Sequence, residues 1–340
     1  MAGLASKTKR LKKAAAELRK QSGRTIFRRA SKGEQGPCKS LQNAKLGMEK
    51  ISWDHLELAI PASLNILGAK LSKMSQALLY QGILERRTKP SRRGTTICLD
   101  MARHGVKEIA GYLPTDKKIW YSLRNKDISR NVRAYLWKCM HRAHRCGGYW
   151  LKLPGYEQRA ECRICGSEES MEHILTECQG SGQKTVWKLV QELLTRKGIP
   201  QTATPTFGQI LGSSLASFHD QKGKLLKGSS RLYTIIISES AYLVWRLRCE
   251  WRIERDEDKN RLHTEAEIAN QWLNMVNTRL KLDCLMTDKK RYGRKATNPD
   301  KVEQTWCNVL HDERGLPDGW IVNSEVLVGM RVARPPGRNR

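Results

Sequence analysis

The sequence is poor in acidic residues, in aromatic residues and in long hydrophobic runs. It has 34 Asp and Glu against 62 Lys and Arg, and aromatics make up only 6% of its 340 residues. No N-terminal apolar stretch of the kind found in signal peptides occurs, nor does an apolar run of about 18 residues. We therefore expect neither secretion nor insertion into a membrane.

Cysteine is also sparse, at 10 residues in the whole chain. A disulfide scaffold would need a much higher density. Most of these cysteines lie singly within apolar patterns, which is typical of small core residues in a reducing compartment. This composition favours a nuclear or cytoplasmic protein.

Positive charge is abundant and unevenly distributed. Residues 1–150 hold 32 Lys and Arg against 10 Asp and Glu, a net +22, whereas residues 151–340 hold 30 against 24, a net +6. An excess of this size favours a polyanionic partner, and nucleic acid is the obvious one. We expect residues 1–52 to form a basic arm that is disordered until it meets a polyanion. A solvated tail without a role would have the same composition.

A dense group of metal-ligand residues lies within the stretch CRICGSEESMEHILTEC, residues 162–178. Zn²⁺ takes four S or N ligands in a tetrahedron, and a site closed by four protein ligands is structural rather than catalytic. Gly166 permits a tight turn, and Ser170 can cap a short helix. The alternatives are buried thiols beside a surface histidine, or a disulfide. We predict one structural zinc ion with the ligands Cys162, Cys165, His173 and Cys178.

Apolar residues recur at helical spacing along most of the chain, and few segments alternate as strands do. The sequence therefore predicts a mostly α fold, a multi-helix array around a small zinc knuckle of the CCHC type. Pro61 and the Thr264–Glu267 capping pattern mark two helix starts. The expected helices are 62–84, 97–110, 127–146, one around Val186–Leu194, a short one near Ile210, 230–255, one from Thr264, and a last one carrying Val302, Trp306 and Leu310.

Residues 127–146 are expected to form an amphipathic helix with one apolar face and one cationic face. The apolar stripe runs from Ile128 to Ala143, and Gly147 with Gly148 ends the helix. Cations interleaved with an aromatic residue suit a nucleic-acid surface, although an ordinary solvated face remains the alternative. The candidate nucleic-acid-binding residues are Arg130, Arg133, Trp137, Lys138, Arg142 and Arg145.

Two consecutive motifs carry a family resemblance. The stretch IWYSLRNKDISRNVRAYLWKCMHRAHRCGGYW followed by CRICGSEESMEHILTEC resembles the zinc-binding region after the reverse transcriptase in non-LTR retrotransposon polyproteins. Tyr135–Trp137 stands at the position of that family's FLW-type core, and Glu172–Leu175 at that of its EHIL-like stretch. The likeness spans about residues 53–330, and later segments resemble the tail that follows the ribonuclease H domain in fungal elements. It implies zinc-ligand roles for the same four residues.

The departures from that family bear on catalysis. No Asp-Asp pair occurs, although reverse transcriptases hold two Mg²⁺ ions at such a turn. Ribonuclease H needs clustered carboxylates, whereas Glu254, Asp256, Glu257 and Asp258 share one charged helix end. Residues 33–47 stand where the end of a ribonuclease H domain would be, yet they lack His and Asp. The chain therefore resembles a polyprotein C-terminus without its catalytic domains, and we predict that it is not an enzyme.

The resemblance divides the chain into five segments. They are a basic arm (1–52), a helical segment with a basic linker (53–115), a reverse-transcriptase-type zinc-binding domain (116–198), a C-terminal helical domain (199–330) and a basic tail (331–340). The predicted function is non-catalytic binding of RNA or DNA beside a reverse transcriptase and ribonuclease H, which could be supplied in trans. A remnant enzyme of either type and a protein-interaction scaffold are the alternatives.

Overall fold

The computed structural model describes residues 75–86, 92–200, 204–317, 319–322 and 326–330, together with a few single residues between 39 and 46. The chain divides into two compact units, residues 1–89 and 90–340. The main described element of the first unit is helix α3 (Gln76–Arg86), which matches the C-terminal part of the helix expected over 62–84. The start of that helix, most of the basic arm, and the basic tail lie outside the described residues.

The second unit is helical, as predicted. Within the described ranges its β-structure is limited to three isolated antiparallel bridges. None of the helices described is both long enough and apolar enough to cross a membrane. The helices are α4 (Arg93–Ala110), α5 (Asp116–Ser122), α6 (Arg130–Met140), α7 (Gln183–Arg196), α8 (Phe207–Gly212), α9 (Lys227–Ile253), α10 (Glu265–Leu285), α11 (Lys289–Tyr292) and α12 (Pro299–Trp306).

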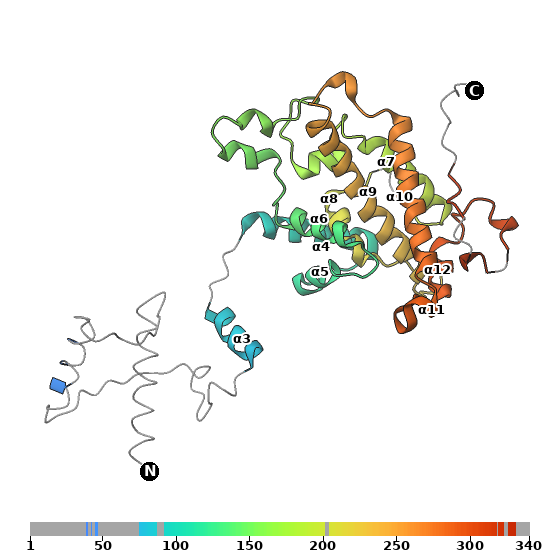
Figure 1. Cartoon of the computed structure of the whole chain (residues 1–340), viewed down its shortest axis with the longest axis horizontal. Helices are drawn as coiled ribbons and strands as arrows, with labels where there is room; N and C mark the ends of the chain where they lie inside the picture. The colour runs from blue at the N-terminus through green and yellow to red at the C-terminus, as the bar shows by residue number, and fades with distance from the viewer. Residues whose placement is uncertain are drawn as a thin grey trace, which may run out of the picture. The chain divides into compact units, whose positions relative to one another are not determined.

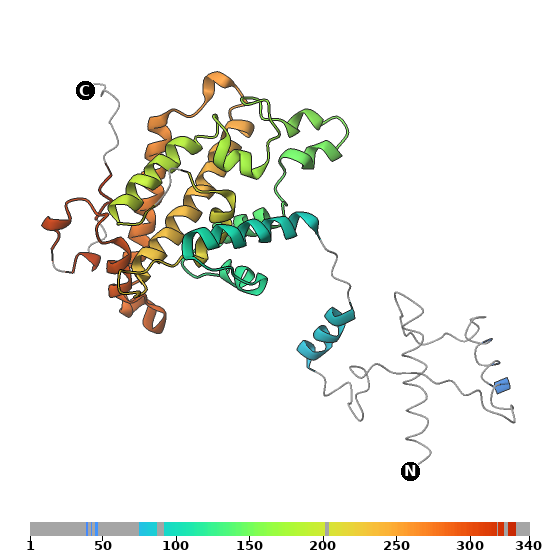
Figure 2. The same cartoon turned by 180° about the vertical axis from the view of Figure 1, so that it is seen from behind.

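Helix α9 is the central element of the second unit (Figures 1 and 2), and it packs against α6, α7, α8, α10 and α12. Consecutive residues of its first half, from Arg231 to Ser238, are all buried. A helix that is apolar on every side is expected to be enclosed by other elements. The long apolar helix predicted over 230–255 is therefore confirmed, with a start three residues earlier.

A buried polar network joins α9 to its neighbours. The buried guanidinium of Arg231 binds both carboxylate oxygens of Asp283 on α10, at 2.6 and 2.9 Å, and an oxygen of Asp127 at 2.7 Å. Trp306 on α12 donates its Nε1–H to Asp283 as well, at 2.9 Å. A buried charge is tolerated only when it is paired in this way. These bonds fix α10, α12 and the segment before α6 around one point of α9.

One local prediction is confirmed, and the length of the last predicted helix is wrong. The capping box of α10 is present, since Thr264 Oγ1 accepts from Glu267 N at 3.2 Å and Glu267 Oε2 accepts from Thr264 N at 2.8 Å. Helix α12 ends at Trp306, so the predicted last helix is shorter than its apolar pattern. Leu310 instead pairs with Val328 in an antiparallel bridge.

Helices α4 and α8 cross at two glycines. A Cβ atom on Gly208 would lie 2.2 Å from the carbonyl oxygen of Met101, and a Cβ on Gly105 would lie 2.3 Å from the backbone of Gly208. No side chain fits at such distances, so the backbones touch directly. Buried residues from each of α4, α6, α7, α9 and α12 contribute to one hydrophobic cluster. The boundaries predicted near 115 and 198 stay predictions.

Candidate metal centre

The four predicted zinc ligands converge. Their ligand atoms all lie within 4.8 Å of one another, so Cys162, Cys165, His173 and Cys178 form a cluster that could hold a metal ion. The Sγ of Cys178 lies 3.7 Å from that of Cys162 and 4.0 Å from that of Cys165. Zn–S bonds of about 2.3 Å in a tetrahedron place the sulfurs about 3.8 Å apart. The separations therefore suit a shared ion, and the three thiols are free rather than disulfide-bonded.

The first two ligands lie on a tight turn. Gly166 N donates to the carbonyl oxygen of Cys162, and Cys162 N donates to that of Ser167, both at 2.8 Å. Gly166 has φ +69°, a left-handed conformation that favours glycine, as its position in the sequence predicted. The turn brings Cys162 and Cys165 to the same side of the backbone.

The other two ligands lie at the ends of a wide helical turn. Ser170 Oγ accepts from His173 N at 3.0 Å, which confirms the predicted cap. Residues His173–Glu177 are π-helical, and Cys178 N donates to the carbonyl oxygen of His173 at 2.7 Å. In an α-helix of 3.6 residues per turn, a residue five positions along would point away from the first. The wider π turn brings Cys178 back to the side of His173.

The imidazole of His173 is oriented for metal binding. Its Nδ1 lies 3.3 Å from Ser167 Oγ and 3.4 Å from Glu177 Oε2. Its Nε2 is buried and has no hydrogen-bond partner among the described residues. Metal-bound histidines usually have one ring nitrogen held by an oxygen and the other on the ion. A buried nitrogen without a partner is costly, and a metal ion would satisfy it.

The thiols favour a cation electrostatically. A hydrogen bond from the Cys178 thiol lowers the pKa of Cys162 to about 4, and the same pairing, together with burial, raises the pKa of Cys178 well above its ordinary value. The first thiolate of the pair therefore forms easily and the second does not. A divalent ion supplies the positive charge that lets several thiolates coexist.

The cluster is anchored to α9 by a buried acid that the sequence interpretation missed. Glu169, which is 2% exposed, lies between the turn and the His173 helix along the chain. Arg248 on α9 contacts both of its oxygens, with Nε 3.0 Å from Oε1, and Arg252 contacts Oε2 at 2.5 Å. Arg252 also donates to the carbonyl oxygen of Arg159 at 3.0 Å. The metal-ligand segment is thus bound to the central helix.

The metal-ligand segment packs mainly on helices other than the one predicted at 127–146. The His173–Glu177 turn packs chiefly on α7 and α9. Trp187 of α7 donates to the carbonyl oxygen of Leu175 at 2.6 Å. A hydrogen bond of 3.0 Å from Gly148 N to Glu168 Oε1 links the chain after α6 to the metal-ligand segment.

Helix α6 is shorter than predicted, because it ends at Met140 instead of continuing to 146. The backbone turns at Arg142, which has φ +47°, and Ala143 is exposed rather than part of the apolar stripe. Leaving the helix lets His144 become buried with its Nε2 3.2 Å from the carbonyl oxygen of Tyr135. Arg142 and Arg145 therefore lie on a loop.

Five of the six candidate nucleic-acid-binding residues line two pockets on opposite flanks of α6, and Arg142 lines neither. Arg130, Arg133 and Trp137 line a pocket of about 560 Å³ with Arg124, Trp120 and His141. Lys138 and Arg145 line a second pocket on the other flank, and Arg142 lies beside Gly94 of α4. Within the described part of the chain, no carboxylate forms a salt bridge with the five cations of the predicted set. The cations expected in a single row along one helix face are therefore distributed over two pockets and, in the case of Arg142, a separate position beside α4.

Comparisons of this chain with protein-family models, with curated proteins and with solved structures find no match. The retrotransposon origin inferred from the motifs therefore stays a prediction. Among the acidic residues weighed for a ribonuclease H site, Glu257 forms ion pairs with Arg163 at 2.6 Å and with Arg252 at 2.7 Å.

Proposed function

We propose that this chain is a zinc-stabilised, non-catalytic nucleic-acid-binding module of the kind that accompanies a reverse transcriptase and ribonuclease H in non-LTR retrotransposons. The observation that carries the proposal is the surface around α6, where four arginines and Lys138 line two pockets that also contain aromatic rings, among them the exposed Trp137. Phosphates would give these cations negatively charged partners, and nucleic-acid bases would stack on the rings.

Zinc would act here as a structural ion. The ligand set of three thiolates and one imidazole closes a tetrahedron, so no open position remains for water. Because these ligands converge only in the folded chain, metal binding and folding would be coupled, with about 10–16 kcal/mol of apparent binding energy in small zinc domains. Through Glu169 and α9, the ion would stabilise the body that carries α6.

The pocket lined by Arg130, Arg133 and Trp137 is the primary contact surface. Trp137 is 51% exposed, and its ring lies 4.4 Å from that of His141, which stacks on Trp120 at 5.0 Å. A base laid on this aromatic group would have its phosphates near the two arginines. Neutralising about five phosphates gives a slope of log affinity against log salt of about −3.5 for a single strand and about −4.5 for a duplex.

Fluorescence anisotropy with labelled RNA and DNA at several salt concentrations tests this function. We expect salt-dependent binding that the double variant Arg130→Glu/Arg133→Glu weakens at least about tenfold. The matched control is Lys184→Glu/Lys188→Glu, which makes the same change in net charge at exposed positions of α7. Equal effects of the two double variants, or no salt-dependent binding by the unaltered chain, would refute the proposal.

Metal content provides a separate test. Native mass spectrometry of the purified chain should show one zinc ion, and Cys162→Ser should lose it together with thermal stability. Cys307→Ser is the control, because Cys307 lies outside the cluster and is only half-buried. Purification of the unaltered chain without zinc, or a zinc-loaded chain that melts at the same temperature as Cys162→Ser, would contradict the structural-zinc assignment.

A further inference from the structure

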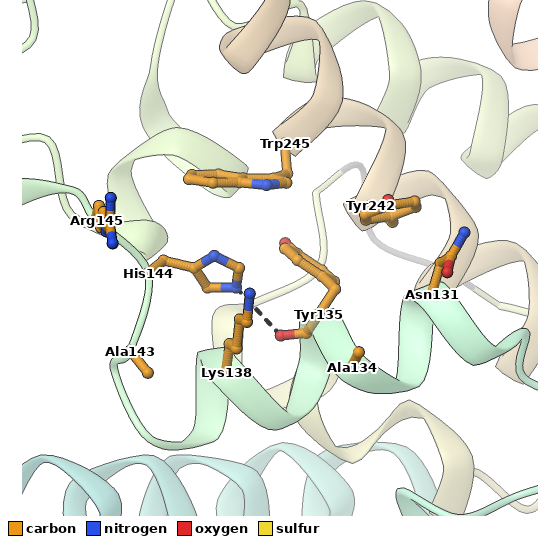
Figure 3. Close-up of a pocket in the computed structure, with 9 residues that line it drawn as sticks. All are labelled: Asn131, Ala134, Tyr135, Lys138, Ala143, His144, Arg145, Tyr242 and Trp245. Carbon is orange, nitrogen blue, oxygen red and sulfur yellow. Dashed lines mark hydrogen bonds between the residues drawn. The ribbon is translucent and has the colours of Figure 1, made fainter.

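The flank of α6 that faces α9 carries a pocket of about 500 Å³ whose lining includes two tyrosines, a tryptophan and a histidine (Figure 3). Tyr135 and Lys138 come from α6, Tyr242 and Trp245 from α9, and His144 from the loop after α6. The ring centroids lie 4.6 Å apart for His144 and Trp245, and 5.3 Å apart for Tyr135 and Tyr242. The sequence interpretation assigned no role to Tyr242, Trp245 or His144.

The rings are held in place by their own contacts. Tyr135 donates its hydroxyl to the carbonyl oxygen of Ala241 at 3.3 Å. His144 Nε2 donates to the carbonyl oxygen of Tyr135, which leaves Nδ1 of the neutral ring as an acceptor. The guanidinium of Arg248 lies 5.2 Å from the centroid of Trp245, within cation–π range. A planar ligand therefore meets rings that are already oriented.

The charges around the pocket select an anionic ligand. Lys138 and Arg145 line it and are exposed, and no Asp or Glu occurs among its described lining residues. Aromatic walls favour a flat ring, whereas the two cations favour phosphate. A cationic ring compound would meet like charges here. A nucleotide satisfies both requirements.

Ala134 connects this pocket with the one on the opposite flank, since it lines both. It is exposed on α6, and its side chain is a single methyl group. The ridge of the helix is therefore low at this point, and a sugar–phosphate backbone can cross it with one base on either side. Larger side chains flank the crossing on both sides, with Arg130 before it and Lys138 after it.

We propose that a single strand of RNA or DNA crosses α6 at Ala134 and inserts an unpaired base into the pocket of Tyr135, Tyr242 and Trp245. This inference rests on the proposed function and specifies its ligand as single-stranded. Lys138 and Arg145 bind the phosphates of the inserted nucleotide, and the neighbouring base stacks at Trp120 and Trp137. A paired base inside a duplex presents no free face to these rings, so it cannot enter.

Anisotropy titrations with three oligonucleotides of one sequence test this inference. They are a single strand, the same strand with several bases removed to leave abasic sugars, and the duplex. We expect the intact single strand to bind about tenfold more tightly than either of the others at equal salt. Ala134→Leu should remove that preference, whereas Ala77→Leu, at an exposed position of α3, should retain it.

A measurement on the unaltered chain complements the variants. A single strand carrying 2-aminopurine should lose fluorescence when its base stacks against the rings of the pocket, and melting curves show whether Ala134→Leu remains folded. Equal affinity for single strand and duplex, or an unquenched 2-aminopurine in a bound strand, overturns the base pocket while leaving the proposed function intact. Loss of salt-dependent binding to all three oligonucleotides instead refutes the proposed function itself.

Discussion

Replacing Glu169 by glutamine tests how strongly the metal-ligand segment depends on α9. The amide has the shape of the carboxylate but no charge. Arg248, whose described side-chain hydrogen bonds both go to Glu169, would be left as an uncompensated buried cation. Arg252 is less affected because Glu257 also binds it, at 2.7 Å.

The expected loss follows from the burial of this pair. Removing one partner of a buried ion pair typically costs about 3–5 kcal/mol. For a domain of this size, each kcal/mol lowers the melting temperature by about 2–4 °C, so a decrease of about 6–20 °C is expected. Because the acid also holds the ligand segment in place, zinc affinity should fall about 10- to 100-fold, as for other groups that orient metal ligands.

Thermal melting by circular dichroism and zinc competition with a chromophoric chelator measure the two effects. Glu168→Gln is the matched control, since this neighbouring acid is exposed and its amide oxygen can still accept from Gly148 N. Melting temperatures of the two variants within about 2 °C of each other would show that the pair contributes far less than its burial implies. The anchoring role of Glu169 would then be wrong.

Three further predictions concern pH, packing and metal removal. Burial alone would raise the pKa of Asp127, but Arg231 and Lys301 outweigh it, so the net pKa is below its ordinary value. Asp127→Asn should therefore lower the free energy of unfolding by about 1–3 kcal/mol at neutral pH. The difference from the unaltered chain should shrink as acid protonates Asp127, and denaturant titrations at several pH values measure it. Gly208→Ala should cost at least about 2 kcal/mol in the same assay, whereas Gly82→Ala, whose Cβ meets nothing within 4 Å, should not. A zinc chelator should lower the melting temperature of the unaltered chain but not that of Cys162→Ser.

Periodicity and local chemistry predicted much of this fold from sequence. The capping box at Thr264, the turn at Gly166 and the cap at Ser170 depend on neighbouring residues, and each is present. The convergence of the four metal ligands was also predicted, because all of them lie within residues 162–178. These features could be predicted because the residues that form them are close together in the sequence.

The failures arise where distant segments decide the structure. The apolar pattern at 127–146 continues past Met140, yet the chain leaves the helix and buries His144 near Trp245, about a hundred residues further on. From sequence alone, Glu169 would be predicted to be an ordinary surface acid, because its partner Arg248 lies far along the chain. No local pattern predicts such partners, since they are set by tertiary packing.

Arg248 connects the metal-ligand segment with the aromatic pocket, because its guanidinium binds Glu169 and also lies over the ring of Trp245. Truncating Arg248 would disturb both the metal-ligand segment held by Glu169 and the aromatic pocket that contains Trp245. The effect of that variant could therefore not be assigned to either one alone. Investigators who want to separate the two roles should instead alter Glu169 on one side and Tyr242 on the other.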